Sequence, residues 1–200
     1  QQDGAKVAVA CATGCMEVST TVYPNSAWKV PFIHNAFENS AATISGAEAA
    51  YRSLKKQGKI DDDIRFIAFG GDGGTYDIGL QSLSGALERW HNFTYICYDN
   101  EAYMNTGIQR SGGTPKGAHT NTAPAGKVSA GKSQQKKDLT AIAEAHGLPF
   151  VAQASPHRPT DFMKKVQKAV EIEGPCFTNI ISPCPRGWRH APDLAIEIAK

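Results

Sequence analysis

The chain has 200 residues, of which 41% are hydrophobic and 20% charged, and its formal net charge is +2. This length and composition are typical of one globular domain with a buried core. No apolar run reaches the roughly 18 residues of a membrane-spanning helix, the first residues show no signal-peptide segment, and the charge is too small to indicate nucleic-acid binding. We therefore expect a cytoplasmic protein with no membrane and no nucleic-acid partner.

Strands and helices are expected to alternate along the chain. Apolar runs predict strands at 7–10, 64–69, 93–98, 150–154 and 176–181. Helical spacing of apolar residues predicts helices within 34–56 and 78–90, over 138–146 and 159–173, and from 191 onward. This alternation predicts an α/β fold with a mostly parallel sheet, helices on both faces, and a single domain over residues 1–200.

Residues Ser111–Ser133 are predicted to form a long loop, because they are rich in Gly, Thr, Ser and Lys and contain two prolines. A loop of this length in a compact domain usually has a function or a partner. The lysines in and after it are expected on a solvated or partner-facing surface: Lys127, Lys132, Lys136 and Lys137.

A glycine-rich turn, Gly70-Gly71-Asp72-Gly73-Gly74, follows one predicted strand, and Asp99-Asn100 follows the next. Glycines let a backbone approach a phosphate closely, while an Asp carboxylate and an Asn amide supply the oxygen ligands that Mg²⁺ prefers. The helix predicted between the two strands would return the chain beside the first strand. Asp72 and Asn100 are therefore expected side by side at the carboxyl edge of the sheet, where open α/β sheets bind ligands.

Two other interpretations of the turn compete with a metal–diphosphate site. Gly-Asp-Gly on its own is ordinary turn chemistry. A Rossmann dinucleotide site is disfavoured because the turn is not G-x-G-x-x-G and because Asp72 would repel a bare pyrophosphate. Asp77, shortly after the turn, is expected to cap the N-terminus of the following helix.

These residues resemble a known family. GDG followed after about 25 to 30 residues by Asn is the thiamine diphosphate signature. The longer text GDGGTYDIGLQSLSGALERW…YDNEAYMNTGIQRSGGTP is similar to the β subunits of the pyruvate:ferredoxin oxidoreductase family. The likeness extends to ATGCMEVSTTVYPNSAWKVPFIHNAFENSAA near the start and to EGPCFTNIISPCPRGW near the end. It implies the diphosphate-binding half of a thiamin diphosphate-binding fold.

The resemblance also implies roles for single residues at the cofactor. The Mg²⁺ ligands would be the Asp72 carboxylate, the Asn100 side chain and the Ala102 carbonyl. The backbone would approach the diphosphate at three glycines: Gly71, Gly73 and Gly74. Asn105 would lie near the reacting carbon, where it could hydrogen-bond a developing oxyanion or the substrate carboxylate.

Two of the five cysteines receive a role from the resemblance. Cys15, beside the cofactor, and Cys184 correspond to two of four ligands of a 4Fe-4S cluster. The other two ligands usually come from an upstream Cys-x-x-Cys segment that this sequence lacks, so we expect a fragment without that segment and without the C-terminal tail. The alternative is that both are spare thiols. Cys97 and Cys176 are expected to be buried in strands, and Cys11 has no assigned role.

The implied activity is oxidative decarboxylation of pyruvate to acetyl-CoA, with electrons passing through the 4Fe-4S cluster to ferredoxin. A branched-chain 2-oxoacid or oxalate remains open as substrate, and a non-catalytic scaffold of an iron–sulfur complex is the alternative function. No residue of the chain is a convincing candidate for the carboxylate that activates the cofactor. We therefore expect an α-type subunit with the pyrimidine-binding domain, γ and ferredoxin-like δ subunits, and no activity from the chain alone.

Overall fold

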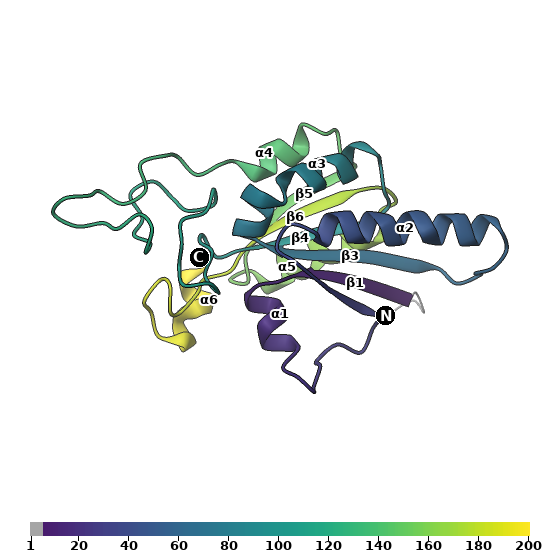
Figure 1. Ribbon diagram of the computed structural model, residues 1–200, viewed down its shortest axis with the longest axis horizontal. Helices are drawn as coiled ribbons and strands as arrows, with labels where there is room; N and C mark the ends of the chain where they lie inside the picture. Colours follow the sequence, from purple (N-terminus) through teal and green to yellow (C-terminus); the bar gives the residue numbers. More distant parts are fainter. Residues whose placement is uncertain (1–5) are drawn as a thin grey trace.

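A parallel sheet forms the centre of the computed structural model, which describes residues 6–200 (Figure 1). Its six strands are β1 (Lys6–Ala12), β2 (Phe32–Asn35), β3 (Ile64–Gly71), β4 (Thr94–Asp99), β5 (Phe150–Ala154) and β6 (Cys176–Ile181). They lie in the order β2-β1-β3-β4-β6-β5, and each neighbouring pair is parallel. The start of the chain, where no signal-like apolar segment is expected, lies outside the described residues.

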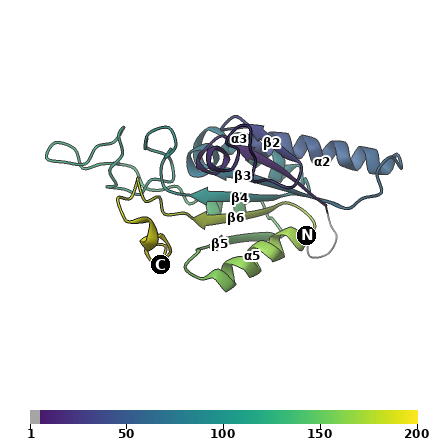
Figure 2. The same ribbon diagram turned by 90° about the horizontal axis from the view of Figure 1, so that it is seen from below.

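Helices cover both faces of the sheet, as predicted. They are α1 (Cys15–Thr20), α2 (Ser40–Lys56), α3 (Leu80–Glu88), α4 (Leu139–Glu144), α5 (Pro159–Glu171) and α6 (Ala195–Ile198), with a π-helix η1 (Gly73–Ile78) and a 3₁₀ turn η2 (Pro192–Leu194). The connections through α2, α3 and α4 run across the sheet in one direction, and those through α1 and α5 run in the other. Because such crossovers are right-handed, the two groups lie on opposite faces. Figure 1 shows α2, α3 and α4 along one side and α1 on the other, and Figure 2 shows α5 away from α2 and α3.

The main core lies between the sheet and the face covered by α2, α3 and α4. Ile44 of α2, Leu83 and Leu87 of α3, and Leu139 of α4 are each about 1% exposed and pack in one cluster with the strand residues. Phe177 of β6 is fully buried in the same cluster. Burial of these apolar side chains is the main term that stabilises the sheet against its helices.

The pairing of β3 with β4 determines where the predicted site residues lie. Gly71, the last residue of β3, pairs with Tyr98 of β4, and β4 ends one residue later at Asp99. Asp72 and Asn100 therefore both follow the ends of neighbouring parallel strands, as expected from their spacing. The excursion from β4 to α4, which includes residues 111–133, contains no helix or named strand and projects from this edge of the sheet (Figures 1 and 2).

Several element predictions need correction. The sequence patterns did not predict α1 or β2, and His34 and Asn35 belong to β2 rather than to the helix that follows. β2 is a four-residue edge strand and α1 has six residues, so neither repeats its periodicity long enough to be recognised. Ile78 and Trp90 were expected on the apolar face of the helix after the glycine turn, but they lie outside α3 and are 58% and 50% exposed.

No helix among the described residues is long and apolar enough to cross a membrane.

The importance of the main core can be tested at Leu87. Leu87→Ala should lower the free energy of unfolding by about 2–5 kcal/mol, because it leaves a cavity at a fully packed position. The matched change Leu194→Ala, at a residue that is 41% exposed, should alter it by about 0.5 kcal/mol or less. Chemical denaturation followed by circular dichroism measures both. Equal losses in the two variants would contradict this assignment of the core.

Candidate metal–diphosphate site

Three polar groups converge where β3 and β4 end. The end of the Asn100 side-chain amide lies 2.8 Å from Oδ1 of Asp72 and 2.9 Å from the carbonyl oxygen of Ala102. If the amide nitrogen occupies that position, it donates a hydrogen bond to both oxygens. If the amide oxygen occupies it, three oxygens meet, and the amide nitrogen instead donates to Sγ of Cys15 at 3.8 Å. In that second orientation the three oxygens require a cation.

The spacing of these atoms fits a magnesium ion. Mg²⁺ binds oxygens at 2.0–2.1 Å in an octahedron, so two neighbouring ligands lie about 2.9 Å apart. Separations of 2.8 and 2.9 Å match the edges of such an octahedron. Within residues 6–200, no three His, Cys, Asp or Glu side chains gather so that they could hold a metal. A cation here would therefore rely on one carboxylate, one amide and one backbone carbonyl.

The backbone after β4 turns sharply to bring the Ala102 carbonyl to this point. Glu101 has a left-handed conformation, with φ of 69°, which is strained for a residue other than glycine. Its N–H donates to Oδ1 of Asp99 at 3.1 Å, and its carbonyl accepts the hydroxyl of Thr114 at 2.5 Å. These bonds hold the strained residue in place. The two hydrogen bonds also fix the direction of the Ala102 carbonyl.

The eight residues predicted to contact the cofactor line one small pocket of about 20 Å³: Cys15, Gly71, Asp72, Gly73, Gly74, Asn100, Ala102 and Asn105. A β-carbon on Gly73 would overlap the ring of Tyr103, and one on Gly74 would meet the carbonyl oxygen of Phe37 at 2.7 Å. Tyr98 also lines the pocket, and its buried hydroxyl has no hydrogen-bond partner among the described residues.

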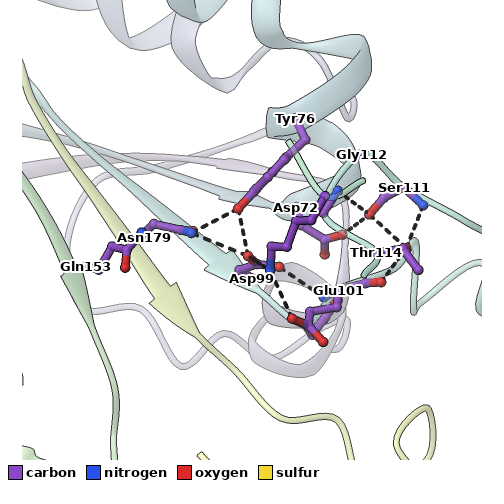
Figure 3. Close-up of polar contacts among 12 residues, drawn as sticks. Asp72, Tyr76, Asp99, Glu101, Ser111, Gly112, Thr114, Gln153 and Asn179 are labelled. Atoms are coloured by element: carbon purple, nitrogen blue, oxygen red, sulfur yellow. Dashed lines mark hydrogen bonds and ion pairs between the residues drawn. The ribbon is translucent and has the colours of Figure 1, made fainter. Parts of the chain in front are cut away.

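Asp72 is 1% exposed, so its charge must be compensated. Burial, and then repulsion from the Asp99 carboxylate, raise the pKa of Asp72 to about 8. The Ser111 hydroxyl donates a hydrogen bond to Oδ2 of Asp72 (Figure 3). Oδ1 faces Asn100. A bound cation would favour the charged form of the carboxylate and so oppose the effect of burial.

A second buried carboxylate, Asp99, has its own polar network beside the first (Figure 3). Its Oδ2 accepts the Tyr76 hydroxyl at 2.8 Å and pairs with Nζ of Lys136 at 2.7 Å. The same ammonium pairs with Glu101 at 2.9 Å, and Asn179 donates to the Tyr76 oxygen at 3.0 Å. Burial opposes the charge of Lys136, but the two carboxylates outweigh it and raise the pKa of the ammonium. Asp99 is thus already paired and is not available to a cation.

A larger cavity of about 750 Å³ opens on the other side of Asp99, lined by parts of α4, α5 and α6. Three of the four lysines that line it, Lys136, Lys137 and Lys165, are each paired with a carboxylate of the chain. It contains neither the glycine turn nor the converging oxygens. We therefore assign the metal–diphosphate site to the smaller pocket.

Two of the five cysteines are buried in strands as the sequence predicted. Cys97 and Cys176 are fully buried in strands, as predicted, and all five cysteines are free. Burial, and then repulsion from Cys184, raise the pKa of Cys15. Cys11 is buried with its pKa raised to about 12, chiefly by burial, which makes it an unreactive thiol.

Two predictions about polar residues were wrong in part. Asp77 does not cap α3: it lies within η1, accepts the N–H of Gly112 at 2.8 Å and pairs with Lys137 at 2.8 Å. Of the lysines expected on a solvated or partner-facing surface, Lys127 and Lys137 are exposed, but Lys132 is 2% exposed and Lys136 is half-buried. Ser111, 39 residues after Asp72, was not predicted to approach it. No local pattern marks such a contact.

An open parallel sheet with a glycine-rich turn at its carboxyl edge is the arrangement in which α/β proteins bind phosphate-bearing ligands. Residues 11–180 match the family described as thiamine pyrophosphate enzyme, C-terminal TPP binding domain, and the chain belongs to this family.

Individual relatives agree with this assignment. The chain is 58% identical over 199 residues to pyruvate synthase subunit PorB of Thermotoga maritima, covering 98% of this chain and 61% of that protein. It is 47% identical over 197 residues to ketoisovalerate oxidoreductase subunit VorB of Pyrococcus abyssi, covering 98% and 63%. The chain thus spans about three fifths of the length of these relatives. They confirm the expected resemblance to the β subunits of this oxidoreductase family.

A solved structure supports the fold. The chain is similar to 2-oxoglutarate:ferredoxin oxidoreductase from Magnetococcus marinus with a TM-score of 0.75 and 23% identity, covering 92% of this chain and 56% of that chain. The predicted α/β fold with a parallel sheet is confirmed.

The closeness of the glycine turn to Tyr103 gives a test of the pocket. Gly73→Ala should weaken binding of Mg²⁺ and thiamine diphosphate by about tenfold or more, because the added methyl group must displace the Tyr103 ring that lines the pocket. Isothermal titration calorimetry measures the affinity. Gly46→Ala, in α2 with open space around the new methyl group, is the control and should bind as the unchanged protein does. Equal affinity in the Gly73 variant would contradict the assigned pocket.

Proposed function

We propose that the chain is the thiamine diphosphate- and Mg²⁺-binding β subunit of a 2-oxoacid:ferredoxin oxidoreductase that converts pyruvate to acetyl-CoA. The observation that carries this proposal is the approach of the Asn100 amide to the Asp72 carboxylate and the Ala102 carbonyl, at 2.8 and 2.9 Å, beside the glycine turn of a domain of the thiamine enzyme family. Similarity to pyruvate synthase subunits over nearly the whole chain supports the choice of reaction.

The chain's own residues would hold and orient the cofactor. Thiamine diphosphate, when bound, supplies the carbanion chemistry at the keto carbon. Asp72, Asn100 and Ala102 would hold the Mg²⁺ that links the protein to the diphosphate. The backbone of Gly71, Gly73 and Gly74 lines the same pocket and would lie against the diphosphate oxygens.

Asn105 would act on the substrate side of the pocket. It is exposed, whereas Asp72 at the other end is buried. An amide in this place can donate a hydrogen bond to the carboxylate of a 2-oxoacid or to an oxyanion that develops on its keto oxygen.

The active site would be shared with a second subunit. A pocket of about 20 Å³ accommodates little more than the metal end of the cofactor, so other surfaces must cover its rings. Asp72 is the one carboxylate among the described residues that line the pocket. The carboxylate that activates the pyrimidine would therefore come from an α-type subunit, whose pyrimidine-binding domain would face this edge of the sheet.

An iron–sulfur cluster would lie beside the cofactor. Cys15 lines the pocket, and its thiol is close enough to Cys184 for the two to interact electrostatically. A cubane cluster takes four thiolates, so the other two ligands would come from outside the described residues. Electrons would pass through this cluster to a ferredoxin-like δ subunit and then to ferredoxin, while coenzyme A accepts the acyl group and a γ subunit completes the complex.

A branched-chain 2-oxoacid is the second candidate substrate. The observation that favours it is the 47% identity to a ketoisovalerate oxidoreductase subunit. Rates of ferredoxin reduction by the assembled complex with pyruvate and with 2-ketoisovalerate, at equal concentrations, would decide between the two.

The metal ligand Asp72 provides the direct test of cofactor binding. Asp72→Ala should lower the affinity for thiamine diphosphate with Mg²⁺ by at least about a hundredfold, since loss of even an outer partner of a ligand costs 10–100-fold. Calorimetric titration measures the affinity of this variant and of the control Asp62→Ala. The control changes an exposed surface ion pair and should leave the affinity unaltered. Unchanged affinity in the Asp72 variant would refute the site.

The cluster assignment has its own test. In the assembled complex, Cys15→Ser and Cys184→Ser should each remove the paramagnetic resonance signal and the iron of one cluster, because serine is a poor substitute for a thiolate ligand. Cys176→Ala, at a buried strand thiol, should keep both. Full iron content in the first two variants would show that Cys15 and Cys184 are structural thiols.

A further inference from the structure

The two oxygens of Asp72 face different partners. Oδ1 lies 2.8 Å from the Asn100 amide, on the side of the cation site, and Oδ2 accepts a hydrogen bond from the Ser111 hydroxyl. Ser111 is fully buried, and its oxygen in turn accepts the N–H of Gly113 at 3.1 Å. The hydroxyl proton is therefore directed at the carboxylate. This bond selects the rotation of the carboxyl group that leaves Oδ1 free for a cation.

The turn that carries Ser111, residues 111–114, packs directly against the buried carboxylates. A β-carbon on Gly113 would lie 3.1 Å from Oδ2 of Asp72 and 3.2 Å from Oδ1 of Asp99. The Ser111 N–H donates to the Thr114 hydroxyl at 3.0 Å, which closes the turn. Figure 3 shows Ser111, Gly112 and Thr114 grouped beside Asp72. A small shift of this turn would move the Ser111 hydroxyl away from its acceptor.

A buried lysine from the far end of the same loop fastens the turn. Nζ of Lys132 donates to the carbonyl of Thr114 at 2.5 Å and to that of Gly112 at 3.2 Å. Lys132 is 2% exposed, and no carboxylate among residues 6–200 forms an ion pair with it. Burying an ammonium group against carbonyl dipoles alone is costly, so a residue that only solubilised the loop would not be placed there. The backbone of Lys132 is held too, by bonds with Gly117 and Ala118.

We propose that Ser111 and Lys132 are positioning residues for the metal ligand Asp72: Lys132 fastens the 111–114 turn, and Ser111 orients the carboxylate toward the cation. The inference rests on the proposed function of the site. It assigns a role to the loop between β4 and α4. This loop would set the affinity of the site for its cation without itself touching the cation.

Binding of Mn²⁺ as a stand-in for Mg²⁺ tests the proposal in the assembled complex. The paramagnetic resonance of free aqueous Mn²⁺, titrated in the presence of thiamine diphosphate, gives the dissociation constant without reference to activity. Ser111→Ala and Lys132→Met should each raise this constant 10–100-fold. Lys127→Met, at an exposed lysine of the same loop, is the matched control and should stay within about twofold. If Lys132→Met does not assemble, Lys132→Gln takes its place in the comparison.

The double variant separates positioning from general stability. Because both residues act through one carboxylate, Ser111→Ala combined with Lys132→Met should bind Mn²⁺ about as weakly as the weaker single variant. Constants that multiply in the double variant would overturn the proposal. So would variants that melt at a lower temperature but bind Mn²⁺ as the unchanged protein does. If the unchanged protein itself binds no Mn²⁺ with thiamine diphosphate, the proposed function fails instead.

Discussion

The Asp72 carboxylate, buried at the edge of a parallel sheet, is the constraint on which the rest of the site depends. A charge that is 1% exposed is unfavourable unless a cation or strong donors compensate it. Ser111 donates a hydrogen bond to Oδ2 of Asp72. Oδ1 lies beside the Asn100 amide, where the proposed cation would bind together with the Ala102 carbonyl. The pairing of β3 with β4 makes this arrangement possible, since it brings Asp72 and Asn100 to the same edge.

A second buried carboxylate, Asp99, lies beside the first, but its charge is compensated in a different way. Asp99 pairs with Lys136 and accepts the Tyr76 hydroxyl, so its charge is balanced within the chain. Asp72 has no such ammonium partner of its own in the part of the chain that the structure describes. Two carboxylates at one sheet edge can therefore have separate tasks. One stabilises the turn after β4, and the other remains available to a metal.

How much could be predicted from the sequence depended on how local each feature is. Asp72 and Asn100 were predicted because a strand, a helix and a second strand separate them by a regular length, and the structure brings them together. β2 and α1 were missed because short elements carry too few repeats of their period. The polar sequence around Lys132 predicts a surface residue, whereas its side chain is buried. Its acceptors lie 18 and 20 residues away, in a turn whose fold no periodicity describes.

The sequence pattern likewise did not predict the π-helix after Asp72. Six residues, Gly73–Ile78, follow Asp72 in this rare conformation, which often accompanies functional sites. It places Asp77 against the loop rather than at the start of α3, and so joins the glycine turn to the 111–114 turn. Close packing of Gly73 on Tyr103 and of Gly74 on Phe37 explains why glycines occupy these positions.

The central claim is that a cation binds where the ends of β3 and β4 meet, and crystallography of the assembled complex with Mn²⁺ and thiamine diphosphate tests it most directly. The account predicts one anomalous-scattering peak about 2 Å from Oδ1 of Asp72, the Asn100 side-chain oxygen and the Ala102 carbonyl oxygen, with a diphosphate on its open side. A cofactor bound elsewhere, or a peak between Asp99 and Glu101 in place of Lys136, would contradict it.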